Sequence, residues 1–408
     1  MRNRTMGLSK AKVLTIVFLW ATVALVSMFA LTPCSYAAGQ NGQAITQVVG
    51  IESTQSAKSY SSTKITKSNP VVVIRVSYAT GKFSNAYPPG GTYSAARVKR
   101  QSGYELYDVV LWSNRISCYY FGKDFADIWD EYVQTHGFPD VDKANSACLK
   151  LREKYCISWS SVKCGQYENT NNSAAKYKAF AKIFKAIKKR TPSKHVVLKY
   201  SGHGGGVNLF CAINEKYSLK TLAAGTKTFG AKFAIIDYGT NCASASAYTL
   251  DKYAPYTDYM IMCQQDWGGW SWDARTQNAD GTIKQAYLYV DSDSRYHEAF
   301  KLGKNMRDAA RRLVDLNRDE WTSLAKTYIK KHQIRCSNIA VDTKAFAKLR
   351  SAMKKSRKLA AYDGNDVYAS IKGDANLRAL YKKSVVAYRR TKDLGVTWSK
   401  YENGINIY

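Results

Sequence analysis

The chain has 408 residues, of which 45% are hydrophobic and 13% aromatic. It is long and apolar enough for two or three folded domains, and this composition excludes a wholly disordered protein. Lysine and arginine number 61 against 31 acidic residues, which gives a net charge of +30. We therefore expect binding to anionic polymers or membrane surfaces. No nucleic-acid-binding motif accompanies the charge, so we expect no specific recognition of nucleic acid.

The N-terminus has the pattern of a secretory signal peptide. Four basic residues and an apolar stretch over 13–31 precede Ser35-Tyr36-Ala37, which has the small-x-small pattern of a cleavage site. We expect residues 1–38 to be removed and the protein to be secreted or held at the cell surface. The apolar stretch is also long enough to remain as an uncleaved anchor. Loss of residues 1–37, with their four basic side chains, leaves +26 of the +30 charge.

Regular structure is predicted from Val71 onward. Residues 39–68 are rich in Ser, Thr, Gln and Gly, which is typical of a linker or pro-segment. The β-branched run over 71–78 predicts a buried strand. Further strands are predicted at 107–112, 195–200, 232–237 and 257–263, and helices at 124–135, 173–190 and 243–253.

The alternation of strands and helices predicts an α/β domain over 69–295. Its sheet is expected to be mostly parallel and flanked by helices on both faces. Beyond residue 295 the pattern becomes rich in Ala, Lys and Leu. Helices are predicted there at 296–331, 343–357 and 373–389, so that 296–408 forms a helical C-terminal region.

Two consecutive predicted strands end next to residues that can carry chemistry. The strand over 195–200 leads to His203, and the strand over 232–237 leads to Cys242. In an open α/β sheet, ligands bind at the carboxyl ends of the strands. A cysteine and a histidine placed there can act as nucleophile and general acid/base. The glycines after His203 let a substrate approach the backbone and leave an amide for an oxyanion.

This arrangement resembles the caspase-like cysteine peptidases, and the clostripain family most closely. The resemblance is best over 195–275, weak near 337–355 and faint elsewhere. The matching pieces are Tyr200-Ser201-Gly202-His203-Gly204, the glycine run to Gly206, Pro255-Tyr256-Thr257-Asp258-Tyr259, Gln264-Gln265, Gly268-Gly269-Trp270 and Ser337–Asp342.

The resemblance implies a caspase-like fold and a cysteine-type endopeptidase. In that case Cys242 attacks the scissile carbonyl and forms a thioester acyl-enzyme, and His203 protonates the leaving amine. The amides of Gly204 and Cys242 hold the oxyanion. Calcium is the one cofactor that the resemblance implies, and no other is expected. If the protein is a peptidase, its many basic loops predict self-cleavage in a surface loop. No two cysteines have CxxC spacing, so no structural zinc site is expected either.

The sequence departs from the family pattern just before the nucleophile. Clostripains usually have Asp-x-Cys there, and that Asp helps to recognise a basic side chain. This chain has Thr240-Asn241-Cys242, and its nearest preceding acid is Asp237. Asp237 is a candidate for the substrate pocket or a cap on the strand end. An alternative alignment places Gly239 opposite the nucleophile, which would make the protein an inactive relative.

Further candidates for the substrate pocket are Thr240, Asp266, Trp267 and Trp270, of which the two tryptophans fit packing equally well. Asp291 and Asp293 could contribute to a calcium site, although most such pairs are simply solvated. Two other functions remain open. One is an inactive surface protein that binds anionic cell-wall or host polymers, and the other is a transpeptidase that uses the same acyl-enzyme.

Overall fold

A computed structural model describes residues 57–78, 104–122, 125–137, 141–165, 169–200, 206–239, 241, 244–263, 276–277, 283–284, 296, 298–316, 337–356, 367–390 and 405. The predicted signal peptide lies outside these residues. No helix in the described ranges has the length and apolar content needed to cross a membrane.

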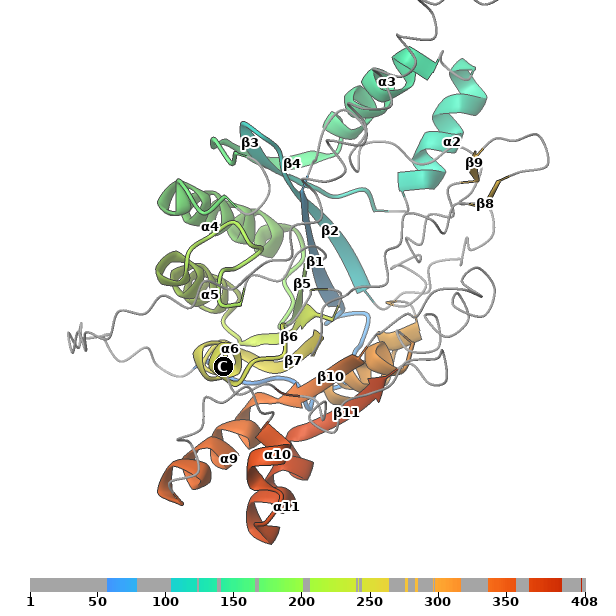
Figure 1. The fold of residues 1–408 in the computed structure, drawn as a ribbon. Helices are drawn as coiled ribbons and strands as arrows, with labels where there is room; N and C mark the ends of the chain where they lie inside the picture. The colour runs from blue at the N-terminus through green and yellow to red at the C-terminus, as the bar shows by residue number, and fades with distance from the viewer. Residues whose placement is uncertain are drawn as a thin grey trace, which may run out of the picture. The chain divides into compact units, whose positions relative to one another are not determined.

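A nine-stranded mixed sheet forms the centre of residues 55–408 (Figure 1). Five neighbouring strands are parallel and two antiparallel strands extend each side, in the order β11-β10-β7-β6-β5-β1-β2-β3-β4. The strands are β1 Val71–Tyr78, β2 Tyr104–Leu111, β3 Arg115–Tyr119, β4 Cys156–Ser161, β5 His195–Tyr200, β6 Phe233–Tyr238, β7 Thr257–Cys263, β10 Ser337–Asp342 and β11 Val385–Arg390. The predicted mostly parallel α/β sheet is confirmed. A separate short hairpin pairs β8 Thr276–Gln277 with β9 Ile283–Lys284.

Helices cover both faces of the sheet, as the continuous apolar runs of its central strands require. The helices are α2 Phe125–His136, α3 Val141–Glu153, α4 Ser173–Arg190, α5 Glu215–Phe229, α6 Ala247–Tyr253, α9 Thr343–Lys355, α10 Val367–Ile371 and α11 Ala375–Ser384. Helices α4, α5, α6, α9 and α11 share the larger buried core on one face. A helix over 306–316 packs on the other face.

The C-terminal region is not purely helical. The helix predicted over 373–389 is wrong in its last part, because α11 ends at Ser384 and the chain continues as β11. Strand β10 pairs antiparallel with β7 and with β11, so residues beyond 295 supply two strands to the central sheet. Helix α9 begins directly after β10, where the Asp342 carboxylate accepts the Ala345 amide at 3.0 Å.

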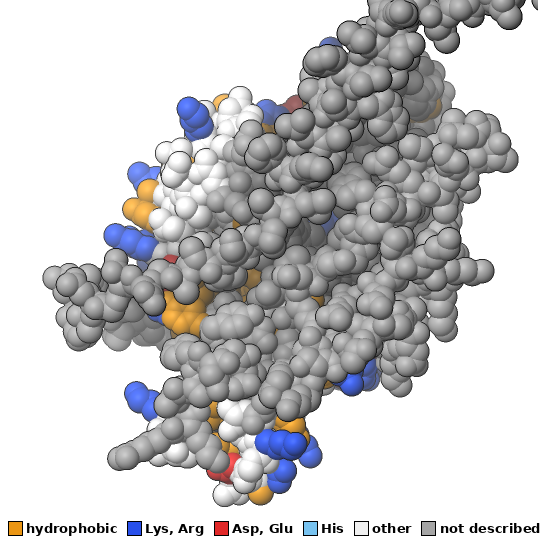
Figure 2. Space-filling view, in the orientation of Figure 1, with side chains coloured by type: hydrophobic (Ala, Val, Ile, Leu, Met, Phe, Trp, Pro, Cys, Tyr) orange, Lys and Arg blue, Asp and Glu red, His pale blue; other side chains and the backbone are white. Residues whose placement is uncertain are grey.

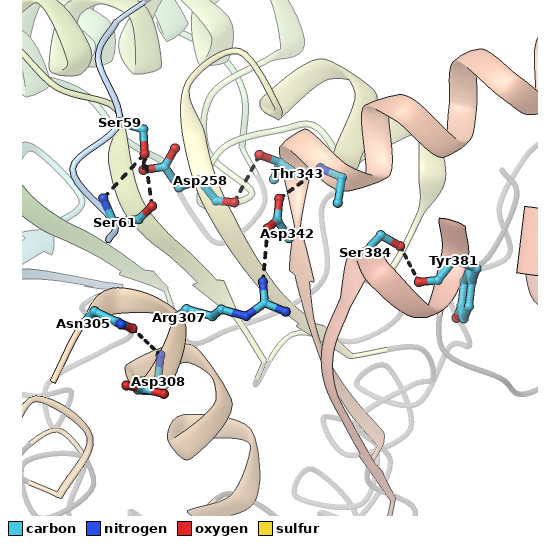
Figure 3. A network of polar contacts seen from close by, with 11 residues as sticks. Ser59, Ser61, Asp258, Asn305, Arg307, Asp308, Asp342, Thr343, Tyr381 and Ser384 are labelled. Carbon is cyan, nitrogen blue, oxygen red and sulfur yellow. Dashed lines mark hydrogen bonds and ion pairs between the residues drawn. The ribbon is translucent and has the colours of Figure 1, made fainter. Parts of the chain in front are cut away.

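Residues 57–69 run along the amino ends of the parallel strands and form what we call the N-terminal strap. Ser59 donates a hydrogen bond to Asp258 at the start of β7 (2.8 Å; Figure 3). The Met306 amide donates to Ser61 O (3.0 Å). Ile65 is 1% exposed. This part of the segment predicted as a linker is therefore packed against the sheet.

Candidate active site

The strands that lead to His203 and Cys242 are parallel neighbours in the sheet. Strand β5 ends at Tyr200 and β6 at Tyr238, and Leu198 pairs with Ile236 across them. His203 and Cys242 themselves lie outside the described residues. The register shows that the two strands end side by side at one edge of the sheet.

The last two residues of β5 and β6 contact each other on both faces of the sheet. Lys199 Nζ lies 3.1 Å from Asp237 Oδ2, and both side chains are nearly inaccessible to solvent. On the opposite face the rings of Tyr200 and Tyr238 meet edge to face, with centroids 6.0 Å apart. Burial raises the pKa of Tyr238 well above its ordinary value, which keeps this phenol neutral. An ion pair and an aromatic pair thus join the two strand ends.

The turn after β6 begins with a crowded glycine. The Gly239 amide donates to Asp237 Oδ1 (2.9 Å), and its carbonyl accepts from Asn338 Nδ2 on β10 (2.5 Å). A Cβ at residue 239 would lie 3.0 Å from Ile261 Cγ2, tighter than ordinary van der Waals contact. Position 239 therefore has little room for a nucleophilic side chain. Asp237 has the contacts of a strand-end cap.

Residues on either side of Cys242 are tied to the ends of the neighbouring strands. The Asn241 amide donates to Tyr238 O (2.9 Å). Ser244 Oγ accepts the Cys263 amide at the end of β7 (2.9 Å). Asn241 and Ser244 are both buried. The segment that carries the candidate nucleophile is thus held at 241 and again at 244, by β6 and β7.

The segment after the histidine block is also held in place. Tyr253 of α6 donates its hydroxyl proton to Val207 O (2.8 Å). Phe210 and Cys211 have left-handed backbone conformations, with φ of 58° and 52°. Such conformations cost about 1–3 kcal/mol and persist only where packing enforces them. The Phe210 ring supplies that packing through an edge-to-face contact with Tyr200, at 5.8 Å between centroids.

The other predicted site residues lie outside the described residues: Gly204, Thr240, Asp266, Trp267 and Trp270, together with Asp291 and Asp293. Sequence reasoning missed Lys199 and Asn338. Lys199 could have been recognised because it interrupts an apolar run, between Val196–Leu198 and Tyr200. Nothing in the sequence around Asn338 marks it. The described residues contain no group of three or more His, Cys, Asp or Glu side chains that could hold a metal ion.

Solved structures of C11 (clostripain-family) cysteine proteases are similar to this chain. The secreted C11 protease "iotapain" from Bacteroides thetaiotaomicron is 11% identical, with a TM-score of 0.49, and the match covers 83% of this chain and 93% of that chain. An inactive zymogen C11 protease from Parabacteroides distasonis is 12% identical, with a TM-score of 0.44 and coverage of 83% and 88%.

A clostripain from Bacteroides thetaiotaomicron in complex with a peptide inhibitor matches 46% of this chain and 84% of its own, at 16% identity and a TM-score of 0.31. No protein-family model and no curated protein matches the sequence.

Proposed function

We propose that the protein is an exported cysteine endopeptidase in which Cys242 and His203 form the catalytic pair. The observation that carries this proposal is the adjacency of β5 and β6, whose carboxyl ends lead directly to these two residues. Ligands bind at that edge in open α/β sheets.

The reaction follows the chemistry of the two side chains. The Cys242 thiolate attacks the scissile carbonyl, and a thioester forms as the carbon–nitrogen bond breaks. His203 gives a proton to the leaving amine and then accepts one from the water that hydrolyses the thioester. The amides of Gly204 and Cys242 are the proposed donors to the oxyanion. Transfer of the acyl group to an amine instead of water would give a transpeptidase.

Cleavage of a mixed peptide library by residues 39–408, followed by mass spectrometry, tests this function. We expect defined cleavages by the wild-type chain and none by Cys242→Ala. Intact masses of the two proteins test self-cleavage in the same experiment, since loop processing should occur only in the wild type. Cleavage that persists in Cys242→Ala would remove this cysteine from the mechanism. An amine acceptor appearing in the products would indicate transpeptidation.

The second candidate function is binding to an anionic cell-wall polymer, and helices α4 and α5 favour it. Together they carry ten basic residues and one acidic residue. That acid, Glu215, pairs with Lys252 at 3.0 Å. Figure 2 shows Lys and Arg side chains along the side of the molecule where α4 and α5 lie. We call the exposed lysines of these helices the basic face: Lys178, Lys182, Lys185, Lys189, Lys216, Lys220 and Lys227.

An exposed tryptophan lies next to the basic face. Trp159 on the edge strand β4 is 55% exposed, and its carbonyl accepts a hydrogen bond from Lys182 Nζ (2.9 Å). A polymer that carries both ring-shaped units and negative charges can contact the Trp159 ring and the neighbouring lysines at the same time. Binding that survives in Cys242→Ala would separate this function from peptidase activity.

A further inference from the structure

A buried ion pair lies at the point where β5 and β6 end. Lys199 and Asp237 are register partners, each one residue before the end of its strand. Their side chains are 3% and 4% exposed, with Nζ and Oδ2 separated by 3.1 Å. The three residues before Lys199 and the four before Asp237 are apolar and buried. Each charged residue thus follows directly after a run of buried apolar residues in its strand.

Stability alone does not explain this placement. Taking both charges out of water costs several kcal/mol per ion, and well-packed apolar residues of similar size are often as stabilising or more so. What a buried ion pair adds is a fixed geometry between two specific atoms, and buried polar residues are known to set register in some proteins. The position of Lys199 and Asp237 at the candidate site therefore needs a geometric explanation.

The Asp237 carboxylate joins two structures at once. Its Oδ2 atom contacts Lys199 on the strand that leads to His203. Its Oδ1 atom accepts the Gly239 amide at 2.9 Å, in the turn that leads to Cys242. One carboxylate thereby ties the end of β5 to the start of the turn after β6. A shift of either oxygen would move one turn relative to the other.

We propose that Lys199 and Asp237 are positioning residues that set the separation between His203 and Cys242, an inference that rests on the proposed peptidase function. Neither residue contacts the substrate in this account. The pair acts by holding the two strand ends so that both side chains reach the same scissile bond. A displacement of about 1 Å between reacting groups can cost about a hundredfold in rate.

The same row of the sheet supplies a matched control. Asp108 on β2 is also a buried carboxylate, and it lies in register with Arg75, which in turn lies in register with Lys199. Arg75 binds Asp108 with atoms 2.6 and 2.8 Å apart. Arg152 also lies 3.4 Å from the Asp108 carboxylate. Asp108→Asn and Asp237→Asn thus make the same chemical change at two buried carboxylates, each paired with basic side chains. Only the second pair adjoins the turn that leads to Cys242.

The test compares these two variants in kcat, KM, melting temperature and the rate of Cys242 alkylation by iodoacetamide. For Asp237→Asn we expect kcat to fall about 10- to 100-fold, with KM within about twofold of wild type. In addition, His203→Ala should change the rate of Cys242 alkylation in the wild type but not in Asp237→Asn. For Asp108→Asn we expect a lower melting temperature and an unchanged kcat.

A further variant, Lys199→Met/Asp237→Asn, separates position from stability. It leaves no unpaired charge, and the asparagine oxygen can still accept the Gly239 amide, so its melting temperature should approach that of wild type. Its kcat should remain as low as that of Asp237→Asn. If the double variant does not fold, the two Asp→Asn variants alone decide the outcome.

Three results would overturn the proposal. If the wild type cleaves peptides and Asp237→Asn has the same kcat, the pair has no positioning role, and the peptidase function is unaffected. An equal loss of kcat in Asp108→Asn would mean that kcat falls because the sheet as a whole is destabilised, and not because the Lys199–Asp237 pair is lost. A wild-type chain that neither cleaves peptides nor reacts at Cys242 would overturn the peptidase function, and the positioning role with it.

Discussion

Asp237 shows how a single residue's role depends on its partners. The sequence left it as a pocket residue or a strand cap, because only its distance from Cys242 was visible. In the fold its two oxygens face Lys199 and the Gly239 amide, and the side chain is buried. A carboxylate that is already paired with a lysine is a poor receptor for a substrate's basic side chain. Preference for Arg or Lys at the cleaved bond is therefore not expected from Asp237.

Gly225 offers a test of packing at the residue scale. It lies on α5 where the helix contacts the sheet, and a Cβ there would lie 2.4 Å from Phe233 Cζ and 3.1 Å from Phe184 Cε2. We expect Gly225→Ala to lower the free energy of unfolding by about 1–3 kcal/mol through overpacking, despite a gain of about 1 kcal/mol in helix propensity. Chemical denaturation measures this change.

The control for Gly225 is Gly373, in the turn after α10. A Cβ at Gly373 meets no atom within 4 Å, so Gly373→Ala should change the free energy of unfolding little. If both alanine variants were as stable as wild type, the contact of α5 with Phe184 and Phe233 would be looser than described.

At the scale of elements, the N-terminal strap predicts a dependence of stability on pH. His195 is buried at the start of β5, with Nε2 2.6 Å from Thr63 Oγ1 and 3.2 Å from Tyr60 O. Burial lowers the pKa of His195 below 6.5. The unfolded chain therefore binds this proton more readily, so stability present above about pH 6.5 is lost as the pH falls through the folded-state pKa.

Melting temperatures between pH 7.5 and 5 check this expectation for the strap. The wild type should lose stability over the range, and His195→Gln should lose less. His136→Gln, which removes an exposed histidine at the end of α2, serves as the matched control. An identical pH dependence in His195→Gln would show that the strap contact does not titrate.

The elements predicted correctly are those with a strong and continuous apolar pattern. Four elements were predicted with the correct first and last residues: β1, β5, β7 and α4. Central parallel strands are recognisable as continuous apolar runs, and an amphipathic helix is recognisable from apolar residues at helical spacing. Strand β4 was missed because it is a partly exposed edge strand with the sequence CISWSS. Helix α5 was missed because its glycine and four threonine and serine residues weaken the helical signal.

Strand β11 shows a different limit of sequence reasoning. Its residues Val385–Arg390 follow α11 without a turn signal, so the whole stretch reads as one helix. These residues form a strand because they pair with β10, which lies nearly fifty residues earlier in the chain. The ends of β5 and β6 were predictable because each strand contains a continuous apolar run. Asn338, which donates a hydrogen bond to the turn after β6, was not predictable because it comes from distant β10. His203 and Cys242 themselves remain predictions.

At the scale of the whole molecule, the +30 charge predicts binding to polyanions that is strongest on the basic face. We expect Gln at Lys178, Lys182, Lys185 and Lys189 to weaken binding to inorganic polyphosphate about tenfold, and to make the slope of log K against log salt shallower by about three. Titrations at several salt concentrations measure both quantities.

The control for the basic face removes the same charge elsewhere. Helix α9 carries four exposed lysines, Lys344, Lys348, Lys354 and Lys355. Their replacement by Gln should weaken polyphosphate binding much less than the α4 substitutions. Equal effects of the two sets would mean that binding follows total charge and has no preferred face.

The central claim is that Cys242 and His203 work together at the edge formed by β5 and β6. Its most direct test treats residues 39–408 with peptidyl acyloxymethyl ketones that differ in the side chain before the reactive group, and locates the adduct by peptide mass spectrometry. We predict a rapid adduct on Cys242 that is lost in His203→Ala. No adduct with any probe, in reducing buffer with and without calcium, would contradict the peptidase account and favour the polyanion-binding function.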